Sequence, residues 1–413
     1  MNEILARCAE LTRISASPHH LERAYLTKEH QEANDLVAEW MSAAGLAVRV
    51  DAVGNLVGRL GPADAPALVL GSHLDTVPDA GAYDGMLGVV LAIAAASRLR
   101  SASLPFALEV YGFSDEEGSR FGKALLGSSG ASGQWDPAWW SLSDAAGMTL
   151  RQAFVDFGLD PEHVADAARS PEDLVGYLEA HIEQGPELEA ADRSLGYVTS
   201  IAGARRFVVS VIGEARHAGG TPYPRRRDAL VGAAEAVSLV ERSARRTWKC
   251  AGQGVIATVG QLSVSPGAVN VIPGRADFSV DVRAATDAER DAAWTQMVDG
   301  ISAICTERGL RLEVEEVHSA GAAPCAPWLQ SAVQAGIAAT DDVGASEPMG
   351  LWSRAGHDAM AMAAVTDIGM LFVRCHDGIS HHPAESVREV DVARALDALT
   401  AAVMAVADTW STA

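Results

Sequence analysis

One loop of the sequence combines a histidine with two acidic residues. Residues 71–89, GSHLDTVPDAGAYDGMLGV, contain His73, Asp75 and Asp84. An apolar run that predicts a buried strand precedes the loop, and an apolar run that predicts a helix follows it. The carboxyl end of a strand is where an open α/β sheet keeps its chemistry. Taken alone, the loop is explained equally well as an ordinary polar connection.

Further imidazoles and carboxylates follow other apolar stretches. They are the pair Glu116 and Glu117 in FSDEEGSRFG, His181 in HIEQG, and His381 and His382 in GISHHPAE. Imidazole and carboxylate without thiolate suit zinc, manganese, cobalt or nickel. A single histidine of this kind is more often packed or at the surface than a ligand. Several such groups, each just beyond a predicted strand, weaken that explanation.

A pair of metal ions would explain the number of these groups. One bridging carboxylate and two terminal ligands for each ion make five protein groups and leave positions for water and substrate. A sixth group, a carboxylate that binds no metal, would take the proton from the attacking water. The sequence supplies all six. Adjacent glutamates allow one side chain to bind metal while its neighbour faces the water.

The elements that must position these residues indicate an α/β domain. Residues 1–50 are predicted to be helical from two stretches of helical apolar spacing. The segment AVRVDAVGNLVGRL alternates around a Gly-Asn break and predicts a hairpin. Strand, helix and strand patterns follow over residues 67–113, which predicts a largely parallel sheet. Near the end of the chain we expect a helix in WLQSAVQAGIAA, a strand in MLFVRC that rejoins this sheet, and a closing helix in DVARALDALTAAVMAVADTW.

The pattern changes in the middle of the chain. Residues 206–319 predict the order β-α-β-β-α-β, which is the split βαβ arrangement of a ferredoxin-like unit. We therefore expect a discontinuous catalytic domain, residues 1–205 and 320–413, interrupted by an α+β domain of residues 206–319. Groups on the two domains could meet only through closure of a hinge near residues 205 and 320.

Composition limits the partners of the chain. The 413 residues include 32 basic and 54 acidic ones, for a net charge of −22. Non-specific binding of nucleic acid or of an anionic membrane is excluded, and an anionic substrate needs a local positive site. Charges near the N-terminus argue against a signal peptide, and the longest apolar run is too short to span a bilayer. Scattered cysteines predict reduced thiols in a cytoplasmic protein: Cys8, Cys250, Cys305, Cys325 and Cys375.

Six motifs together resemble one enzyme family. GSHLDTV…YDG, DEEGSRF, HIEQGP, HAGGTP, GHDA and GISHHPAE resemble the metal-dependent amidases of the peptidase M20 type, in the hydantoinase/carbamoylase branch. That branch includes N-carbamoyl-L-amino-acid hydrolases, β-ureidopropionases and allantoate amidohydrolases. The resemblance covers essentially the whole chain. It implies an aminopeptidase-like catalytic domain with two metal ions, an inserted dimerisation or lid domain, and a homodimer.

The resemblance also implies a ligand set for two divalent ions per subunit, zinc or manganese, with cobalt or nickel as alternatives. The implied ligands are His73 and His181 on one ion, Glu117 and His381 on the other, and Asp84 between them. His381 is preferred to His382 because Ser380 precedes it, as in the family pattern S-H-x-P-x-E.

Other residues of the resemblance support the reaction. Glu116 is implied as the general base, and Asp75 as the residue that fixes the tautomer of His73. The family often has a cis peptide bond after the bridging aspartate. We therefore expect one between Asp84 and Gly85, at a cost of roughly 3–4 kcal/mol.

Substrate contacts are implied on both domains. His217 and Asn270 would polarise the scissile carbonyl, and Arg283 would hold a substrate carboxylate in a bidentate fork. In the family these groups reach the active site from the partner subunit. Gln184, Gly356 and His357 would complete the pocket from the first domain. From the residues alone, Arg283 is equally a surface ion pair and Asn270 a turn residue.

Departures from the family concern the substrate more than the chemistry. The family commonly has glycine at the position of Arg354, threonine at Gly220, methionine at Tyr223 and glutamine at Ala204. Arg354 either adds a second anion contact or points to solvent.

We expect hydrolysis of a ureido or carbamoyl C–N bond in a small substrate that carries a carboxylate. The preferred substrate is allantoate, converted to ureidoglycine or ureidoglycolate with ammonia and CO2. The main alternative is an N-carbamoyl-L-amino-acid hydrolase. A dipeptidase is disfavoured because the peptidase relatives have a carboxylate where His181 stands. An inactive metal-binding relative is disfavoured by the intact ligand set and Glu116.

Overall fold

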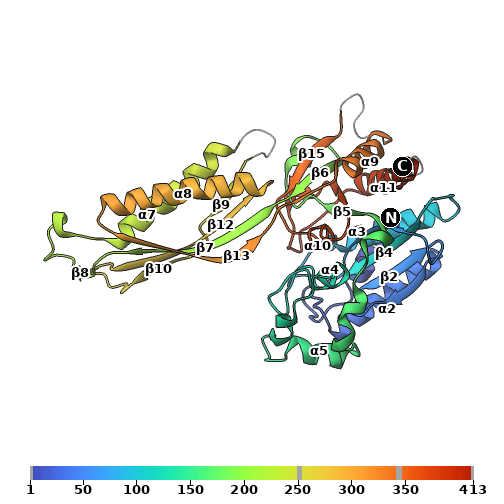
Figure 1. The fold of residues 1–413 in the computed structure, drawn as a ribbon, viewed down its shortest axis with the longest axis horizontal. Coiled ribbons are helices and arrows are strands. Elements are labelled where there is room, and N and C mark those ends of the chain that lie inside the picture. The colour runs from blue at the N-terminus through green and yellow to red at the C-terminus, as the bar shows by residue number, and fades with distance from the viewer. Residues whose placement is uncertain (1–2, 249–253, 341–346, 411–413) are drawn as a thin grey trace. The chain divides into compact units, whose positions relative to one another are not determined.

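The structure is a computed structural model that describes residues 3–248, 254–340 and 347–410. It divides into two compact units (Figure 1). Unit 1 comprises residues 1–199, 325–351 and 355–413, and unit 2 comprises residues 200–324 and 352–354.

Unit 1 is built on a mixed sheet whose centre is parallel. Its strands lie in the order β1 (Ala47–Val50), β2 (Leu56–Leu60), β4 (Ala107–Phe113), β3 (Ala67–His73), β5 (Leu174–Ile182), β16 (Ile368–Val373) and β6 (Leu195–Ile201), with β15 (Met349–Ser353) also paired to β6. Strand β3 runs parallel to β4 and β5, and β16 runs parallel to β5. These four strands are buried along their whole length, as expected for a parallel sheet covered on both faces. The predicted mostly parallel α/β fold is confirmed.

The apolar core of unit 1 joins the sheet to five helices. They are α1 (Glu3–Leu11), α2 (Lys28–Ala43), α3 (Met86–Leu99), α9 (Pro327–Ala338) and α11 (Glu389–Trp410). Helix α3 is buried at eleven of its fourteen residues, because it is apolar on every side and packs against sheet and helices alike. The remaining helices of the unit are short: α4 (Leu126–Ala131), α5 (Leu150–Phe157), α6 (Glu187–Ala190) and α10 (Asp358–Met362), with 3-10 turns η1 (Pro137–Ser141), η2 (Pro161–Ala167), η3 (Pro171–Asp173) and η5 (His376–Gly378).

Unit 2 is an antiparallel sheet with two helices along one face (Figure 1). The strand order is β10 (Leu262–Ser265), β12 (Arg275–Ala284), β7 (Gly203–Ile212) and β13 (Arg311–Ala320), and β9 (Ile256–Thr258) pairs with β12. The helices are α7 (Ala229–Thr247) and α8 (Asp287–Glu307). Apart from a small two-stranded ribbon, the elements follow the predicted β-α-β-β-α-β order, except that β9 and β10 occur where one strand was predicted.

Four small elements complete unit 2. Strands β8 (Arg216–His217) and β11 (Val271–Ile272) form a separate two-stranded ribbon, and η4 (Tyr223–Arg225) follows β8. Strand β14 (Ala323–Pro324) pairs with the last residues of β6.

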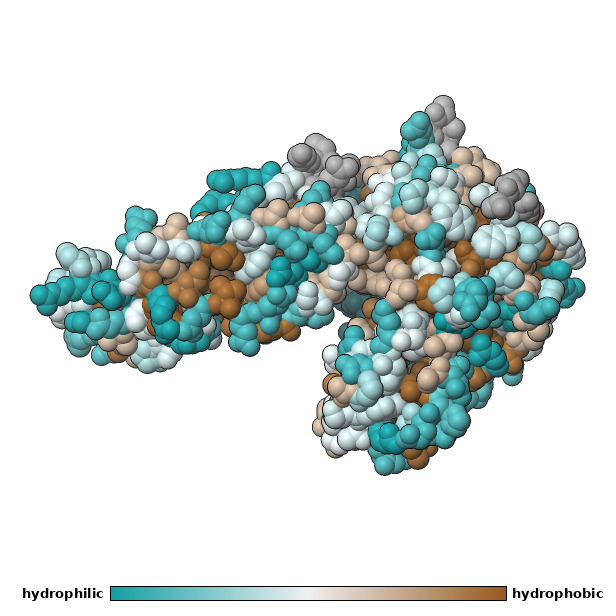
Figure 2. Space-filling view, in the orientation of Figure 1, coloured by the Kyte–Doolittle hydropathy of each residue, from teal (hydrophilic) through white to brown (hydrophobic). Residues whose placement is uncertain are grey.

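Large apolar side chains are exposed more often on unit 2 than on unit 1. Of the twelve most exposed ones among the described residues, seven belong to this smaller unit: Tyr223, Val231, Trp248, Leu262, Val269, Val314 and Val317. Figure 2 shows apolar residues gathered on the visible face of unit 2, with hydrophilic residues around them. Exposed apolar patches of this kind mark interaction surfaces.

The cysteines of the described chain are unpaired. Cys8, Cys305, Cys325 and Cys375 are free and buried, whereas Cys250 lies outside the described residues. Among the residues described, no helix has both the length and the apolar composition needed to cross a membrane.

Candidate metal centre

The parallel strands bring the predicted metal ligands to one edge of the unit 1 sheet. His73 is the last residue of β3, and His181 is the penultimate residue of β5. Glu117 follows β4, and His381 follows β16. Carboxyl ends of parallel strands meet at the same edge, which is why positions so far apart in the sequence become neighbours.

Asp84 lies between two sets of these ligands. One carboxylate oxygen, Oδ1, is 3.1 Å from Nε2 of His181 and 3.6 Å from Nε2 of His73. The other oxygen, Oδ2, is 3.1 Å from Nε2 of His381, which is 3.2 Å from Oε1 of Glu117. Each set of three offers ligand atoms that all lie within 4.8 Å of one another. Two groups of nitrogen and oxygen donors with a shared carboxylate fit a pair of divalent ions.

Two glycines allow Asp84 to reach this position. Gly85 has φ 66° and starts α3, and a Cβ on it would lie 2.5 Å from the ring of His73. One turn later, a Cβ on Gly88 would lie 2.1 Å from the carbonyl oxygen of Ala180 in β5. Only glycine permits this approach of α3 to the strand that carries His181.

The peptide bond between Asp84 and Gly85 is trans, so the expectation of a cis bond was wrong. In the ranges that the structure describes, Ser265–Pro266 is the one cis peptide bond. The positive φ of Gly85 makes the turn from the loop into α3 instead.

Glu116 is buried next to the ligands. It is 8% exposed and forms a set with His73 and Glu117 whose ligand atoms lie within 4.8 Å of one another. The carboxylate of Asp75 accepts hydrogen bonds from the backbone N–H groups of Glu116 at 3.0 Å and of Glu117 at 3.1 Å. Gly356 lies beside this carboxylate, since a Cβ on it would be in ordinary van der Waals contact with Oε1 of Glu116 at 3.7 Å.

Asp75 orients His73 mainly through its backbone. Nδ1 of His73 lies 3.1 Å from the carbonyl oxygen of Asp75 and 3.6 Å from its carboxylate. A ring nitrogen that faces a carbonyl must donate, so Nε2 is the nitrogen turned toward Asp84. The side chain of Asp75 instead holds the chain at Glu116 and Glu117.

The charged groups shift one another's pKa values. Burial would raise the pKa of Asp84, but hydrogen bonds with His181, His381 and His73 hold it well below its usual range. Hydrogen bonds with Asp84 and Glu117 raise the pKa of His381 to about 10. Burial raises the pKa of Glu116 well above its usual value, and Glu117 adds to this.

A comparison with known protein families identifies the family to which this fold belongs. The model of peptidase family M20/M25/M40 matches residues 69–405, a span that includes every ligand named above. The chain belongs to this family.

The relatives of this M20 chain include two groups of curated amidohydrolases. An allantoate deiminase of Arabidopsis thaliana is 39% identical over 95% of the chain and 80% of its own length. An N-carbamoyl-L-amino acid amidohydrolase of Geobacillus stearothermophilus is 38% identical over 94% of both chains. A solved hydantoinase/carbamoylase-family amidase of Burkholderia multivorans is 32% identical, has a TM-score of 0.86 and covers 98% of this chain and 97% of its own.

Three residues around Asp84 form a support that sequence reasoning did not assign. Ser380 donates its hydroxyl to Oδ2 of Asp84 at 2.8 Å or to Glu385 at 3.1 Å. Glu385 also accepts the backbone N–H groups of Tyr83 at 2.7 Å and of Asp84 at 3.1 Å. Gln184, predicted to touch substrate, donates to the same Asp84 oxygen at 3.0 Å. The signal in the sequence that could have indicated this support is the S-H-x-P-x-E pattern, whose serine and glutamate are Ser380 and Glu385.

His357 is buried behind the ligands. Its ring is 4.5 Å from that of His181, and it is 1% exposed. The two histidines and Glu179 form a further close set of donors. Glu179 is fully buried and accepts hydrogen bonds from Ser72 at 2.9 Å and Tyr177 at 3.1 Å. Sequence reasoning missed Glu179 because it lies inside a continuous buried strand, where no motif marks it.

In unit 2 the structure brings His217 and Asn270 together. They are on the β8–β11 ribbon, where His217 pairs with Val271 and the backbone N–H of Ala218 donates to the carbonyl of Asn270 at 2.9 Å. His217 is exposed.

Arg283 lies apart from these two residues within the same unit. It is near the carboxyl end of β12, eight positions after Arg275, where the strand begins. That span is roughly 27 Å of extended chain. The ribbon with His217 lies beyond the Arg275 end (Figure 1). A small substrate cannot touch His217 and Arg283 of one copy.

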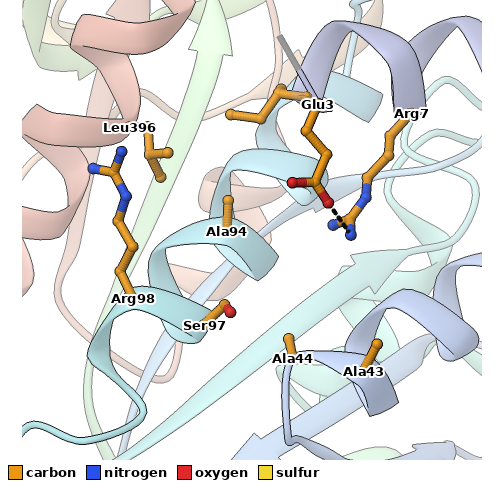
Figure 3. A pocket seen from close by; sticks show the side chains of 9 residues that line it. Glu3, Arg7, Ala43, Ala44, Ala94, Ser97, Arg98 and Leu396 are labelled. Atoms are coloured by element: carbon orange, nitrogen blue, oxygen red, sulfur yellow. Dashed lines mark ion pairs between the residues drawn. The ribbon is translucent and has the colours of Figure 1, made fainter.

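A cavity elsewhere in unit 1 has no comparable chemistry. It measures about 550 Å³ and is lined by Glu3, Ile4, Arg7, Ala43, Ala44, Ala94, Ser97, Arg98 and Leu396 (Figure 3). Its acidic residue, Glu3, is paired with Arg7 at 2.6 Å. The cavity lies at the C-terminal part of α3, whereas Asp84 precedes the N-terminus of that helix. It offers no imidazole and is not the metal centre.

Proposed function

We propose that this M20 chain is an amidohydrolase that cleaves a ureido C–N bond of allantoate with the aid of two divalent metal ions, zinc or manganese. The observation that carries the proposal is the position of Asp84 between two sets of ligands, with Glu116 beside them. The relatives support the choice of substrate, since the Arabidopsis thaliana relative is an allantoate deiminase.

The proposed ligands divide at Asp84. One ion would be held by His73 and His181, and the other by Glu117 and His381. Asp84 would bind both ions. When bound, the ions would polarise the ureido carbonyl and lower the pKa of water. Ser380, Gln184 and Glu385 keep the Asp84 carboxylate and its backbone in place.

Glu116 would move the proton. Its carboxylate would accept a proton from the attacking water and pass it to the leaving nitrogen, so that one C–N bond breaks, ammonia leaves and a carbamate remains. The carbamate would then break its remaining C–N bond to give CO2 and the amine product. The hydrogen bonds from the Glu116 and Glu117 backbone to Asp75 fix where the carboxylate can reach.

Substrate binding would need two copies of the chain. His217 and Asn270 would stabilise the oxyanion, and Arg283 would hold the carboxylate. Since His217 and Arg283 are far apart within unit 2, one substrate would take the first two from one copy and Arg283 from the other. The exposed apolar residues of unit 2 supply a surface for such a homodimer.

The test is a substrate panel with purified, manganese-loaded protein. Ammonia release is measured with allantoate and with N-carbamoyl derivatives of small, acidic and aromatic L-amino acids, and amine release is measured with dipeptides. We expect the highest kcat/KM for allantoate. Preference for one N-carbamoyl amino acid would make the chain an N-carbamoyl-L-amino-acid hydrolase, and amine release from dipeptides alone would contradict the proposal.

A further inference from the structure

A second arginine lines the pocket that contains Arg283. Within unit 2, a cavity of about 390 Å³ is lined by Ile256, Thr258, Asp281, Arg283 and Arg354. Strands β9 and β12 pair so that Arg283 is opposite Ile256 and Asp281 is opposite Thr258. Residues directly opposite each other share a face of the sheet. Arg354 joins them from the separate segment of residues 352–354.

The guanidinium of Arg283 is held by protein groups but keeps donors for a ligand. Its Nε donates to Oδ1 of Asp281 at 2.8 Å, and its Nη2 donates to Oδ2 at 3.3 Å. Its Nη1 donates to the backbone carbonyl of Arg354 at 2.9 Å. An arginine has five N–H donors, so one N–H remains on each of Nη1 and Nη2. Two neighbouring donors of this kind can grip a carboxylate.

The guanidinium of Arg354 lies over two tryptophan rings. Its central carbon is 5.0 Å from the ring centre of Trp248 and 5.7 Å from that of Trp352. A cation over the face of an aromatic ring is attracted by that ring, and these two contacts restrain the Arg354 side chain.

The charges around this pocket favour an anion. Asp281, the carboxylate of the lining, also accepts a hydrogen bond from Nε of Arg206 at 2.8 Å. Among Arg206, Arg283, Arg354 and Asp281, positive charges exceed negative charges by two. In a chain with a net charge of −22, an anionic substrate needs such a local positive site.

We propose that Arg354 is a second substrate-binding residue, whose guanidinium shares the substrate's carboxylate with Arg283. The inference rests on the proposed function, which supplies a substrate with a carboxylate. It explains why the pocket has two arginines where one fork is sufficient to bind a single carboxylate. The backbone carbonyl of Arg354 accepts a hydrogen bond from Arg283, and Arg354 lines the same pocket.

The substitution Arg354→Ala isolates the side chain, because it keeps the backbone carbonyl that holds Arg283. We expect KM for allantoate to rise at least about tenfold, with kcat within about twofold of the unsubstituted protein. Glyoxylate, a small carboxylate found in a solved relative with 29% identity, serves as a binding probe without turnover. Calorimetry should show glyoxylate binding weakened by the same factor.

Two further variants separate the fork from the charge. Arg354→Lys keeps the charge but loses the planar fork. Its affinity for glyoxylate should therefore lie between those of the unsubstituted protein and Arg354→Ala. Arg245→Ala is the control, because it removes the same charge from an exposed position on α7. The Arg245 side chain is 79% exposed and pairs with Glu241. This substitution should change neither KM nor glyoxylate binding.

The outcomes separate this inference from the proposed function. Unchanged KM and glyoxylate affinity in Arg354→Ala, or an equal loss in Arg245→Ala, would overturn the role of Arg354. If Arg354→Ala does not fold, unchanged KM and glyoxylate affinity in Arg354→Lys would overturn the shared fork. An inactive unsubstituted protein would overturn the proposed function, and calorimetry with glyoxylate would still decide whether Arg354 binds a carboxylate.

Discussion

Ser380 lies with its hydroxyl oxygen 2.8 Å from Oδ2 of Asp84, although 296 positions separate the two residues in the chain. The same carboxylate oxygen accepts a hydrogen bond from Gln184 and faces His381. The bridging position of Asp84 is therefore supported from two later segments of unit 1 and not only by its own loop.

Removal of this support should weaken metal binding. In Ser380→Ala, Asp84 loses one of the donors that orient it, and we expect metal affinity to fall about 10- to 100-fold. The measurement is the metal content after dialysis against buffers of defined free Mn²⁺. Ser302→Ala, an exposed position on α8, is the matched control. Equal affinity in Ser380→Ala and the control would show that the hydrogen bond to Asp84 does not matter for the ions.

Glu116→Gln should separate proton transfer from metal binding. The amide cannot accept the proton of the attacking water, so we expect kcat to fall by roughly 10²–10⁴. Metal content should remain unchanged, because Asp84 is supported independently of Glu116. The value of kcat is measured from ammonia release in a stopped assay, and the metal content is measured by elemental analysis of the same sample. Near-normal turnover in Glu116→Gln would contradict the assignment of Glu116 as general base.

Mixing two inactive variants should restore activity if the active site draws on two copies. In a dimer of one His217→Ala chain and one Arg283→Ala chain, one site has lost both residues and the other has both intact. Random exchange of subunits should therefore recover roughly a quarter of the unsubstituted activity. If His217 and Arg283 serve a substrate from the same copy, every mixed site carries one substitution and no activity returns. The assay is ammonia release after co-refolding, compared with each variant alone.

Metal uptake by the metal-free protein should depend on pH. Asp84 and Glu117 raise the pKa of His381 to about 10, so at neutral pH this imidazole is protonated and must lose a proton before it can bind metal. Apparent Mn²⁺ affinity should rise by about tenfold per pH unit for each proton that metal binding releases. The contribution of His381 to this rise should end near the pKa of His381, because above that pH the imidazole is already neutral. Titration in a weakly buffered dye solution measures the released protons directly. Affinity that is flat with pH would contradict the raised pKa of His381.

Much of the metal centre could be predicted from the sequence because its residues follow buried strands. His73, Glu117, His181 and His381 each stand at or just beyond the end of a strand of the parallel sheet. Parallel strands place their carboxyl ends at one edge regardless of the details of the loops. The predicted sheet therefore placed these side chains at one edge, whereas their division into two ligand sets was implied by the family resemblance.

The loops between these strands could not be predicted in the same way. The trans bond after Asp84, the hydrogen bonds from Glu116 and Glu117 to Asp75, and the Ser380 hydroxyl on Asp84 depend on individual backbone angles. Positive φ at Gly85, Asp115, Gln184 and His381 shows how irregular the chain is here. Periodicity and motifs do not encode such angles, which arise from packing of the whole unit.

The sequence by itself determined the kinds of groups available and the strand ends that carry them, because side-chain chemistry and hydrophobic period are local properties of the chain. Tertiary structure alone decided which oxygen of Asp84 faces which histidine, and that Arg283 and His217 occupy opposite ends of unit 2. Both depend on strand register and on contacts between distant segments. The distances between these residues are set when the strands pair in register and the helices pack against the sheets.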